Sequence, residues 1–375
     1  MKIIFTGGGT GGHIFPIIAV SRAIKRIGPS RGLDFMYLGP EDNFSKSALE
    51  KEGIYPQYIL SGKIRRYFSI PAFFENIVDV LFKIPLGIIQ AFYTIVKNPA
   101  VLVFSKGGYG SVPTVIAAWF LGIPIFLHES DISPGLSNKI LSKFSKQIFV
   151  SFPVKETEYF PVDKMIKVGN PTRDSLLWGD KEKAKKIFNL KAQKPVILVL
   201  GGSQGSQRIN DLILGVLSEL LKTYEIIHQT GDYDFERVKT QANAFLYESA
   251  KQEYHAYGFI SEDDLKHAYT AADCVISRAG SGIIFELAIL KKPSILIPLP
   301  ESAQNHQTKN AYAYAKYNAC VVLEENNLSP NFFLKKINNI FETNQLEQMR
   351  RGAESFTSPY AADTIAKYLI EYISK

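Results

Sequence analysis

Cysteine is almost absent from this 375-residue chain, which has only Cys274 and Cys320, each inside an apolar run. Two isolated cysteines neither form a disulfide framework nor provide the paired spacing of a zinc site. The composition therefore does not support a disulfide-stabilised secreted protein or cysteine-based catalysis. No basic segment, apolar core and cleavage site precede the first strand-like run, so we expect a protein of the reducing cytoplasm.

Long hydrophobic runs are also missing. Ile84–Val96 is too short to span a bilayer, and Val112–Leu127 is interrupted by Gly122 and Pro124 near its end. No D-x-D pattern, which often marks a divalent-ion site, is evident at the end of a strand. We therefore expect neither a transmembrane helix nor a bound metal ion.

Acidic residues are scarce in the first half. Residues 1–170 contain 19 Lys and Arg against 12 Asp and Glu, whereas residues 171–375 contain 24 of each, so the whole formal charge of +7 lies in the first half. This asymmetry predicts an acidic partner for that half, either anionic lipid or nucleic acid. An ordinary basic surface is the alternative.

Short apolar runs that end in glycine or polar residues alternate with helical patterns. Strand, glycine loop and helix follow one another at Lys2–Pro16 and again at Pro195–Asp211. The repetition predicts an α/β protein with two doubly wound, Rossmann-like domains that face a central cleft. We place the domains at residues 1–170 and 171–356, joined near Gly169–Asp180, and expect the helix at about 357–375 to pack back on the first domain.

The first glycine loop, Gly7–Gly12, has the form G-x-G-x-x-G between a strand and a helix. Its amides and the helix N-terminus suit a phosphate group. A dinucleotide site would need an acidic residue about 20 positions later. Pro29–Leu33 offers none, and Asp34 only begins the next strand, so NAD is the less favoured ligand.

Five motifs resemble those of glycosyltransferase family 28: TGGGTGGHIFP (Thr6–Pro16), GGYGS (Gly107–Ser111), GNPTR (Gly169–Arg173), GGSQGSQRIN (Gly201–Asn210) and SRAGSGIIFE (Ser277–Glu286). The resemblance runs from end to end and implies the two-domain GT-B fold. It also implies inverting, metal-independent transfer of N-acetylglucosamine from UDP-GlcNAc, without a cofactor, to the 4-hydroxyl of MurNAc in lipid I. Lipid I is undecaprenyl-pyrophosphoryl-MurNAc-pentapeptide, and the product is lipid II for peptidoglycan synthesis.

The same resemblance implies a peripheral protein at the cytoplasmic face of the plasma membrane. Its expected partners are UDP-GlcNAc, lipid I, the anionic membrane surface and proteins of cell-wall synthesis or division, but no nucleic acid. Two rival interpretations remain. One is another GT-B enzyme, either a UDP-sugar transferase with a different lipid acceptor or a UDP-GlcNAc 2-epimerase. The other is a peripheral membrane protein without catalytic activity that binds nucleotide or recruits cell-wall partners.

Donor-binding residues are expected in the second domain. Glu286 stands in an otherwise apolar helix, where the resemblance implies hydrogen bonds to the UDP ribose; pairing with a Lys or Arg is the alternative. The preceding helix start suits the pyrophosphate. By resemblance, the other donor positions are Ser203 for the diphosphate, the Ile260 backbone for uracil, Ser281, Gly282, Ile283, Ile284 and Phe285 in the helix motif, and Gln307 for the GlcNAc hydroxyls, with Gln304, Asn305 and His306 nearby.

Catalytic and acceptor-binding residues are expected mainly in the first domain. His13 follows the first glycine loop, and an imidazole with an unperturbed pKa near 6.5 can take the proton of the acceptor hydroxyl, so we choose it as the general base. Binding the acceptor phosphate or ordering the loop is its alternative role. Arg173 would supply a permanent charge to the leaving UDP, unless it is a plain surface residue.

The other expected acceptor positions are Thr10, Gly11, Gly12, Tyr109 and Asp131, with Glu129 as a competitor. The family usually has asparagine at position 131 and valine at position 110. It therefore stays open whether Asp131 contacts the sugar or tunes His13.

A candidate membrane-binding segment lies at Ile64–Gly87. Phe73, Phe74, Ile77 and Leu81 follow helical spacing, and Lys63, Arg65, Arg66 and Lys83 flank them. An apolar stripe with basic flanks predicts docking on an anionic membrane. The alternative is a helix that packs on its own sheet.

Overall fold

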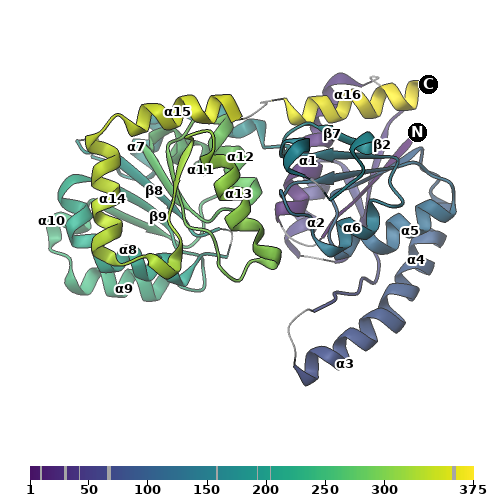
Figure 1. Ribbon diagram of the computed structural model, residues 1–375, viewed down its shortest axis with the longest axis horizontal. Helices are drawn as coiled ribbons and strands as arrows, with labels where there is room; N and C mark the ends of the chain where they lie inside the picture. The colour runs from purple at the N-terminus through teal and green to yellow at the C-terminus, as the bar shows by residue number, and fades with distance from the viewer. Residues whose placement is uncertain are drawn as a thin grey trace. The chain divides into compact units, whose positions relative to one another are not determined.

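The computed structural model describes residues 1–8, 11–28, 32–41, 43–65, 69–157, 159–191, 193–202, 204–356 and 360–375. The chain forms two compact units, Met1–Arg173 together with Ser358–Lys375, and Asp174–Thr357. Each unit is built on one parallel sheet covered by helices (Figure 1). The predicted α/β class with two doubly wound domains is confirmed.

The sheet of the first unit has the strand order β3-β2-β1-β4-β5-β6-β7 in the described part of the chain. Its strands are β1 (Lys2–Thr6), β2 (Asp34–Gly39), β3 (Ile54–Tyr58), β4 (Leu102–Ser105), β5 (Ile125–Glu129), β6 (Gln147–Val150) and β7 (Met165–Lys167). The chain starts in the middle of the sheet and then builds outwards in both directions. Loops that follow β1, β4 and β5 are therefore neighbours.

Helices cover both faces of this sheet. The helices of the first unit, in the described part of the chain, are α1 (Gly11–Ile27), α2 (Asn43–Lys51), α3 (Ile70–Val78), α4 (Ile84–Lys97), α5 (Val112–Phe120), α6 (Leu136–Leu141) and α16 (Ala361–Ser374). Ile3 and Phe5 of β1 belong to the core that contains α1 and α16. Ile4 belongs to the core on the other face, with residues of α4 and α5, because successive side chains of a strand point to opposite faces.

The C-terminal helix α16 is part of the first unit and lies along α1 (Figure 1). Ile365 and Leu369 are fully buried in the core beneath it. Tyr372 stands edge-on to Phe126 of β5, with ring centroids 5.1 Å apart. The end of the chain therefore completes the hydrophobic core of the domain in which the chain begins.

Helices α3 and α4 form an arm that extends from the first unit beside α5 (Figure 1). A π-helical turn, Asp79–Lys83, joins them. Apolar side chains cover much of the arm, and Phe74 and Leu81 are 61% and 62% exposed. The predicted helical stripe is thus exposed and does not pack on the sheet. No helix in the described part of the chain has the length and hydropathy needed to cross a bilayer.

The second unit has the strand order β10-β9-β8-β11-β12-β13 in its described part. The strands are β8 (Val196–Leu200), β9 (Glu225–Gln229), β10 (Tyr254–Tyr257), β11 (Cys274–Ser277), β12 (Ser294–Leu296) and β13 (Cys320–Val322). The helices are α7 (Lys181–Ile187), α8 (Gln207–Thr223), α9 (Phe235–Phe245), α10 (Glu248–Lys251), α11 (Glu262–Ala271), α12 (Ser281–Ile289), α13 (His306–Ala315), α14 (Pro330–Glu342) and α15 (Gln345–Phe356). Here too the first strand, β8, is central, so the loops after β8 and β11 are neighbours.

Candidate functional site

The candidate residues of the first unit lie at the carboxyl ends of β1, β4 and β5, and we call this group the first half-site. The register pairs Thr6 with Ser105, the last residues of β1 and β4. Gly7 and Lys106 follow directly, and Glu129 ends the next strand, β5. Main-chain segments from three separate stretches of sequence are thereby brought to one edge of the sheet.

His13 lies in the first turn of α1, with its half-buried imidazole against two glycines. A Cβ atom on Gly8 would lie 3.1 Å from the ring. Burial and the positive charge of Lys106 lower the pKa of His13 to about 4, although Asp131 acts in the opposite direction. The pKa of His13 therefore differs from the ordinary imidazole value near 6.5 on which its choice as general base is based. The ring is neutral at pH 7, the state in which it can accept a proton.

Asn138 of α6 connects Glu129 with the second glycine loop. Its Nδ2 donates to Glu129 Oε2 at 2.7 Å, and its Oδ1 accepts from the Gly108 amide at 3.1 Å. The amide of Asp131 donates to Glu129 Oε1 at 2.8 Å. Burial and the nearby charge of Asp131 raise the pKa of Glu129 to about 7. This carboxyl group can therefore change its charge near neutral pH.

The glycine at position 110, where the family usually has valine, has a steric reason. A Cβ atom there would lie 2.5 Å from the carbonyl oxygen of Gly7 and 2.6 Å from Pro40 Cδ. The loop that contains Tyr109 thus approaches the first glycine loop too closely for any side chain at position 110. Tyr109 itself is half-buried at the start of a short 3-10 helix, Tyr109–Ser111.

The structure places the predicted residues of the first half-site in different environments. Gly11 and Gly12 begin α1, and Asp131 lies half-buried after β5. Thr10 lies outside the described residues. Arg173 is not a plain surface residue: it is 9% exposed, and its guanidinium lies 4.4 Å from the ring centroid of Phe15, a residue of α1.

The second half-site starts from the glycine loop after β8. Gly202 and Gly205 have φ angles of +95° and +76°, a left-handed conformation that favours glycine. Gln229 at the end of β9 orders this loop, because its Nε2 donates to the Gly202 carbonyl at 3.1 Å. Ser203, the predicted diphosphate contact, lies outside the described residues.

Ile260, predicted to read uracil through its backbone, is tied to the same glutamine. Its side chain is buried, and its amide donates to Gln229 Oε1 at 3.0 Å. The Ile260 N–H is therefore already engaged within the protein. A base could use this amide only if Gln229 moved.

The start of α12 carries the donor motif. Gly280 caps it without a side-chain hydrogen bond, so the amides of Ser281, Gly282 and Ile283 have no partner in the preceding turn and can face an anion. Ile284 and Phe285 are buried. Their side chains therefore contribute to the core.

Glu286 is half-buried on α12, and Tyr269 Oη donates to its Oε2 at 3.1 Å. The phenol orients the carboxylate and leaves it further acceptor capacity, since an ionised carboxylate has about four lone-pair sites. This contact is with a neutral donor, and the ribose role of Glu286 stays a prediction beside the alternative of a Lys or Arg partner.

Gln307 of α13 is partly engaged in holding the main chain. Its Oε1 accepts from the amides of Leu299 and Ala279 at 3.0 and 3.3 Å. Of the side-chain amide, the Nε2 group is thus the better placed to donate to a sugar hydroxyl. The preceding Gln304 and Asn305 have φ angles of +56° and +58°, so this loop has an unusual left-handed backbone.

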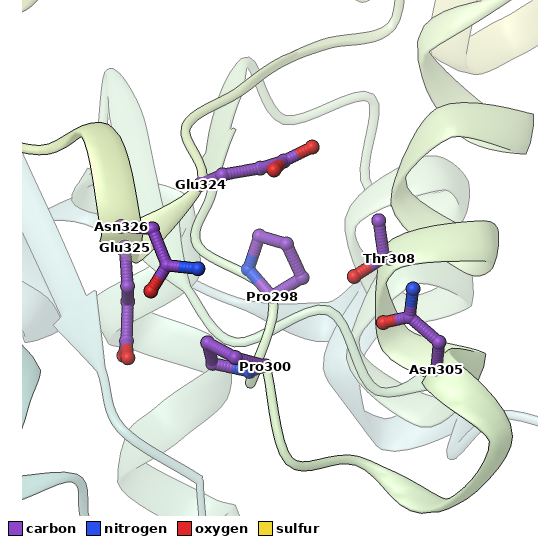
Figure 2. A pocket seen from close by; sticks show the side chains of 7 residues that line it. All are labelled: Pro298, Pro300, Asn305, Thr308, Glu324, Glu325 and Asn326. Atoms are coloured by element: carbon purple, nitrogen blue, oxygen red, sulfur yellow. The ribbon is translucent and has the colours of Figure 1, made fainter.

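A pocket of about 260 Å³ adjoins this loop at the ends of β12 and β13 (Figure 2). Its lining residues are Pro298, Pro300, Asn305, Thr308, Glu324, Glu325 and Asn326. Asn305 is its only predicted member; Glu286 and Gln307 do not line it. Within the described residues, no group of three or more His, Cys, Asp or Glu side chains is arranged to hold a metal ion.

Sequence reasoning missed Arg278, which connects three loops of the second half-site. Its Nη2 donates to Ser206 Oγ at 2.7 Å, its Nη1 donates to the Ile297 carbonyl at 3.1 Å, and it forms an ion pair with Glu325. Arg278 could have been found, because it stands inside a motif that carries the resemblance. Lys106 could have been found in the same way, because it directly precedes the glycine motif that begins at Gly107. Asn138 and Gln229 could not be selected from the sequence, since their roles depend on partners that only the structure shows.

Comparisons with known proteins agree with the predicted two-domain organisation. The chain matches the glycosyltransferase family 28 N-terminal domain over residues 3–150 and the family 28 C-terminal domain over residues 196–365. It is 39% identical to the UDP-N-acetylglucosamine--N-acetylmuramyl-(pentapeptide) pyrophosphoryl-undecaprenol N-acetylglucosamine transferase of Clostridium tetani, over 98% of each sequence.

Two solved structures extend the comparison. The structure of Acinetobacter baumannii MurG is similar with a TM-score of 0.74 and 25% identity, over 99% of each chain. A UDP-GlcNAc 2-epimerase from Neisseria meningitidis has a TM-score of 0.68 at 14% identity, over 100% of each chain. At that identity, the second likeness shows the fold alone.

Proposed function

The chain belongs to glycosyltransferase family 28, and on that basis we propose that it transfers GlcNAc from UDP-GlcNAc to the 4-hydroxyl of MurNAc in lipid I, giving lipid II. The observation that carries this proposal is the 39% identity, over 98% of both sequences, to a relative whose name states that transfer. The epimerase alternative is not favoured, because its support is limited to the fold.

In the first half-site, His13 is proposed as the general base. The acceptor oxygen attacks the anomeric carbon of GlcNAc, the bond from that carbon to the diphosphate oxygen breaks with its electron pair leaving on UDP, and His13 takes the hydroxyl proton. The ring is neutral at pH 7 and can therefore accept a proton, although its lowered pKa makes it a weaker base than a free imidazole. A single displacement of this kind inverts the anomeric centre.

In the second half-site, Glu286 is proposed to accept hydrogen bonds from the ribose hydroxyls. The first-turn amides of α12 are proposed to bind the diphosphate, together with the glycine loop after β8. Gln307 is proposed to donate to a GlcNAc hydroxyl from its Nε2. The orientation of Glu286 by Tyr269 supports the first of these roles.

Arg173 is proposed to stabilise the leaving diphosphate. A guanidinium remains charged throughout the working pH range, and negative charge grows on UDP as the glycosidic bond breaks. Its fixed position on Phe15 limits the side-chain entropy lost on binding. With Arg173 and the start of α12 supplying positive potential, the proposed reaction needs no divalent cation.

The arm formed by α3, the π-helical turn and α4 is proposed to dock on the cytoplasmic face of the plasma membrane, where a lipid-linked acceptor is found. Exposed apolar side chains on both helices support insertion into the interface. Fewer basic side chains of the arm are available to bind anionic lipid than the sequence suggests. Asp79 forms ion pairs with Arg65 and Lys83 at 2.8 and 2.6 Å, and Arg66 lies outside the described residues.

The proposal is tested by UDP release from UDP-GlcNAc with and without a lipid I analogue. We expect release that depends on the acceptor and a product with an inverted, β-configured GlcNAc linkage. Acceptor-independent formation of the C2 epimer would instead identify an epimerase, and UDP binding without turnover would identify a nucleotide-binding protein.

A further inference from the structure

Lys106 is a buried cation at the centre of the first half-site. It follows β4, the strand between β1 and β5, and is only 2% exposed. Its Nζ donates to Ser130 Oγ at 2.8 Å. A hydroxyl does not neutralise an ammonium group, and an uncompensated buried charge is costly, so the position must offer negative charge nearby.

The charged and titratable groups around Lys106 come from each neighbouring element. His13 lies on α1, and His128 and Glu129 lie at the end of β5. Asp131 follows in the next loop. Burial lowers the pKa of Lys106, whereas the carboxylates of Glu129 and Asp131 act in the opposite direction and favour its charged form. Lys106 in turn lowers the pKa of His13 and of His128, although burial is the larger cause in both. His128 is further held by the Gly169 carbonyl, 3.1 Å from its Nε2.

Besides burial, the negative charge of Asp131 raises the pKa of Glu129, whereas the positive charge of Lys106 lowers it. Glu129 is 3% exposed, and Asp131 is bound to it through a backbone hydrogen bond. Glu129 also orders Gly108 through Asn138, and Gly108 lies against His13. The ionisation of this carboxyl group is therefore linked by direct contacts to the loop that supports the proposed base.

We propose that Lys106 is a positioning residue of the first half-site, whose charge is matched to Asp131 and favours the ionised form of Glu129, the carboxyl group that is linked to the loop beside His13. The inference rests on the proposed function and adds a residue to it. It also gives position 131 a role: the carboxylate, in place of the usual asparagine, is balanced by the cation at position 106.

This matching has a quantitative consequence for substitutions. Lys106→Met leaves two carboxyl groups without their cation, so a larger fraction of Glu129 should be protonated at neutral pH. Lys106→Met combined with Asp131→Asn removes one charge of each sign and restores the net charge of the wild-type cluster. The double variant should therefore be more active than Lys106→Met alone.

The experiment measures kcat and the acceptor KM as a function of pH for the full chain with UDP-GlcNAc and a lipid I analogue. Lys106→Met should lower kcat roughly tenfold to a hundredfold, the usual cost of misplacing reacting groups. Its acid-side decline should move to higher pH, because losing the cation raises the pKa of both His13 and Glu129. Asp131→Asn in that background should recover at least about a tenth of the lost activity and move the decline back.

Lys106→Gln separates charge from hydrogen bonding, because glutamine can still donate to Ser130 but carries no charge. We expect it to behave as Lys106→Met does, which also covers the case in which the methionine variant does not fold. UDP affinity, measured by calorimetry, should stay unchanged in all variants. Wild-type activity and pH dependence in Lys106→Gln, or a double variant no more active than Lys106→Met, would overturn the inference.

Failure of the inference can be distinguished from failure of the proposed function. If the wild-type chain transfers no GlcNAc to the lipid I analogue, the function is wrong. If the wild-type chain transfers GlcNAc and the Lys106 variants match it, only the role of Lys106 is wrong.

Discussion

A Cβ atom on Gly108 would lie 2.9 Å from the Nε2 atom of His13, and the φ angle of Gly108 is +82°. Real Cβ contacts are almost never so short, so any side chain at position 108 has to displace the imidazole. The glycine loop after β4 therefore serves as a support against which the proposed base is held.

Gly108→Ala should lower kcat roughly tenfold to a hundredfold through displacement of His13, while UDP affinity stays unchanged. The matched control is Gly122→Ala. Gly122 also has a positive φ, +68°, but a Cβ atom there would meet nothing within 4 Å. Both variants should lose stability from backbone strain, roughly 1–3 kcal/mol each, which denaturant unfolding measures separately from kcat. Equal kcat values for the two variants would contradict the support role.

His13→Ala should lower kcat by roughly 10²–10⁴ if the ring is the general base. Because the pKa of His13 is lowered to about 4, its protonated fraction grows only as the pH falls through about 4. The wild-type rate should lose the base in that range, and this loss should be absent in the variant. A variant that keeps kcat but has a raised acceptor KM would show that His13 binds the acceptor and is not the base.

Glu286→Ala should weaken UDP binding by roughly 1–3 kcal/mol, as expected for hydrogen bonds to a charged group. Tyr269→Phe is the companion variant. It keeps the carboxylate but removes the phenol that orients it, so its loss should be smaller, roughly 0.5–1.5 kcal/mol. Calorimetric titration measures both. An unchanged affinity in folded Glu286→Ala would remove Glu286 from the donor site.

Phe73→Ser with Phe74→Ser should reduce co-sedimentation with anionic liposomes. Because Asp79 pairs with Arg65 and Lys83, we expect a smaller effect of salt than of the double substitution. Phe245→Ser with Tyr247→Ser removes two exposed aromatic side chains from the second unit and should leave binding unchanged. Equal loss in the two double variants would argue against docking through the arm.

Activity should survive EDTA, since Arg173 and the start of α12 are proposed to supply the positive potential for the leaving diphosphate. The measurement is UDP release before and after chelation. Loss of activity with EDTA and its recovery with Mg²⁺ would show that a cation, and not these groups, stabilises the departing UDP.

The fold was predictable because its signals are local. The alternation around Ile3, Ile4 and Phe5 and the glycines that follow identify a buried parallel strand and its loop without any knowledge of the partner strands. The second series of strands, beginning at Val196, repeats the pattern, and both sheets have the expected parallel order. The π-helical turn was not predictable, since Asp79–Lys83 has the composition of an ordinary helix.

The site was predictable only in part. Residues inside glycine motifs, such as His13 and Glu286, could be selected from sequence, and their proposed roles remain predictions. The altered pKa of His13 could not be foreseen, because it arises from burial and from Lys106, which lies 93 positions later in the sequence. The engagement of the Gln307 oxygen by two backbone amides was hidden for the same reason.

The π-helical turn sets the direction in which the apolar side chains of the arm face. The Ile84 amide bonds back to the carbonyl of Asp79, five residues earlier, one more than in an α-helix. One extra residue in a turn rotates the preceding helix by about 100° relative to the next. The apolar faces of α3 and α4 are therefore offset from each other around the axis of the arm by about 100°. Deleting a single residue between positions 79 and 83 would turn Phe73 and Phe74 away by that angle and leave the rest of the arm's sequence unchanged.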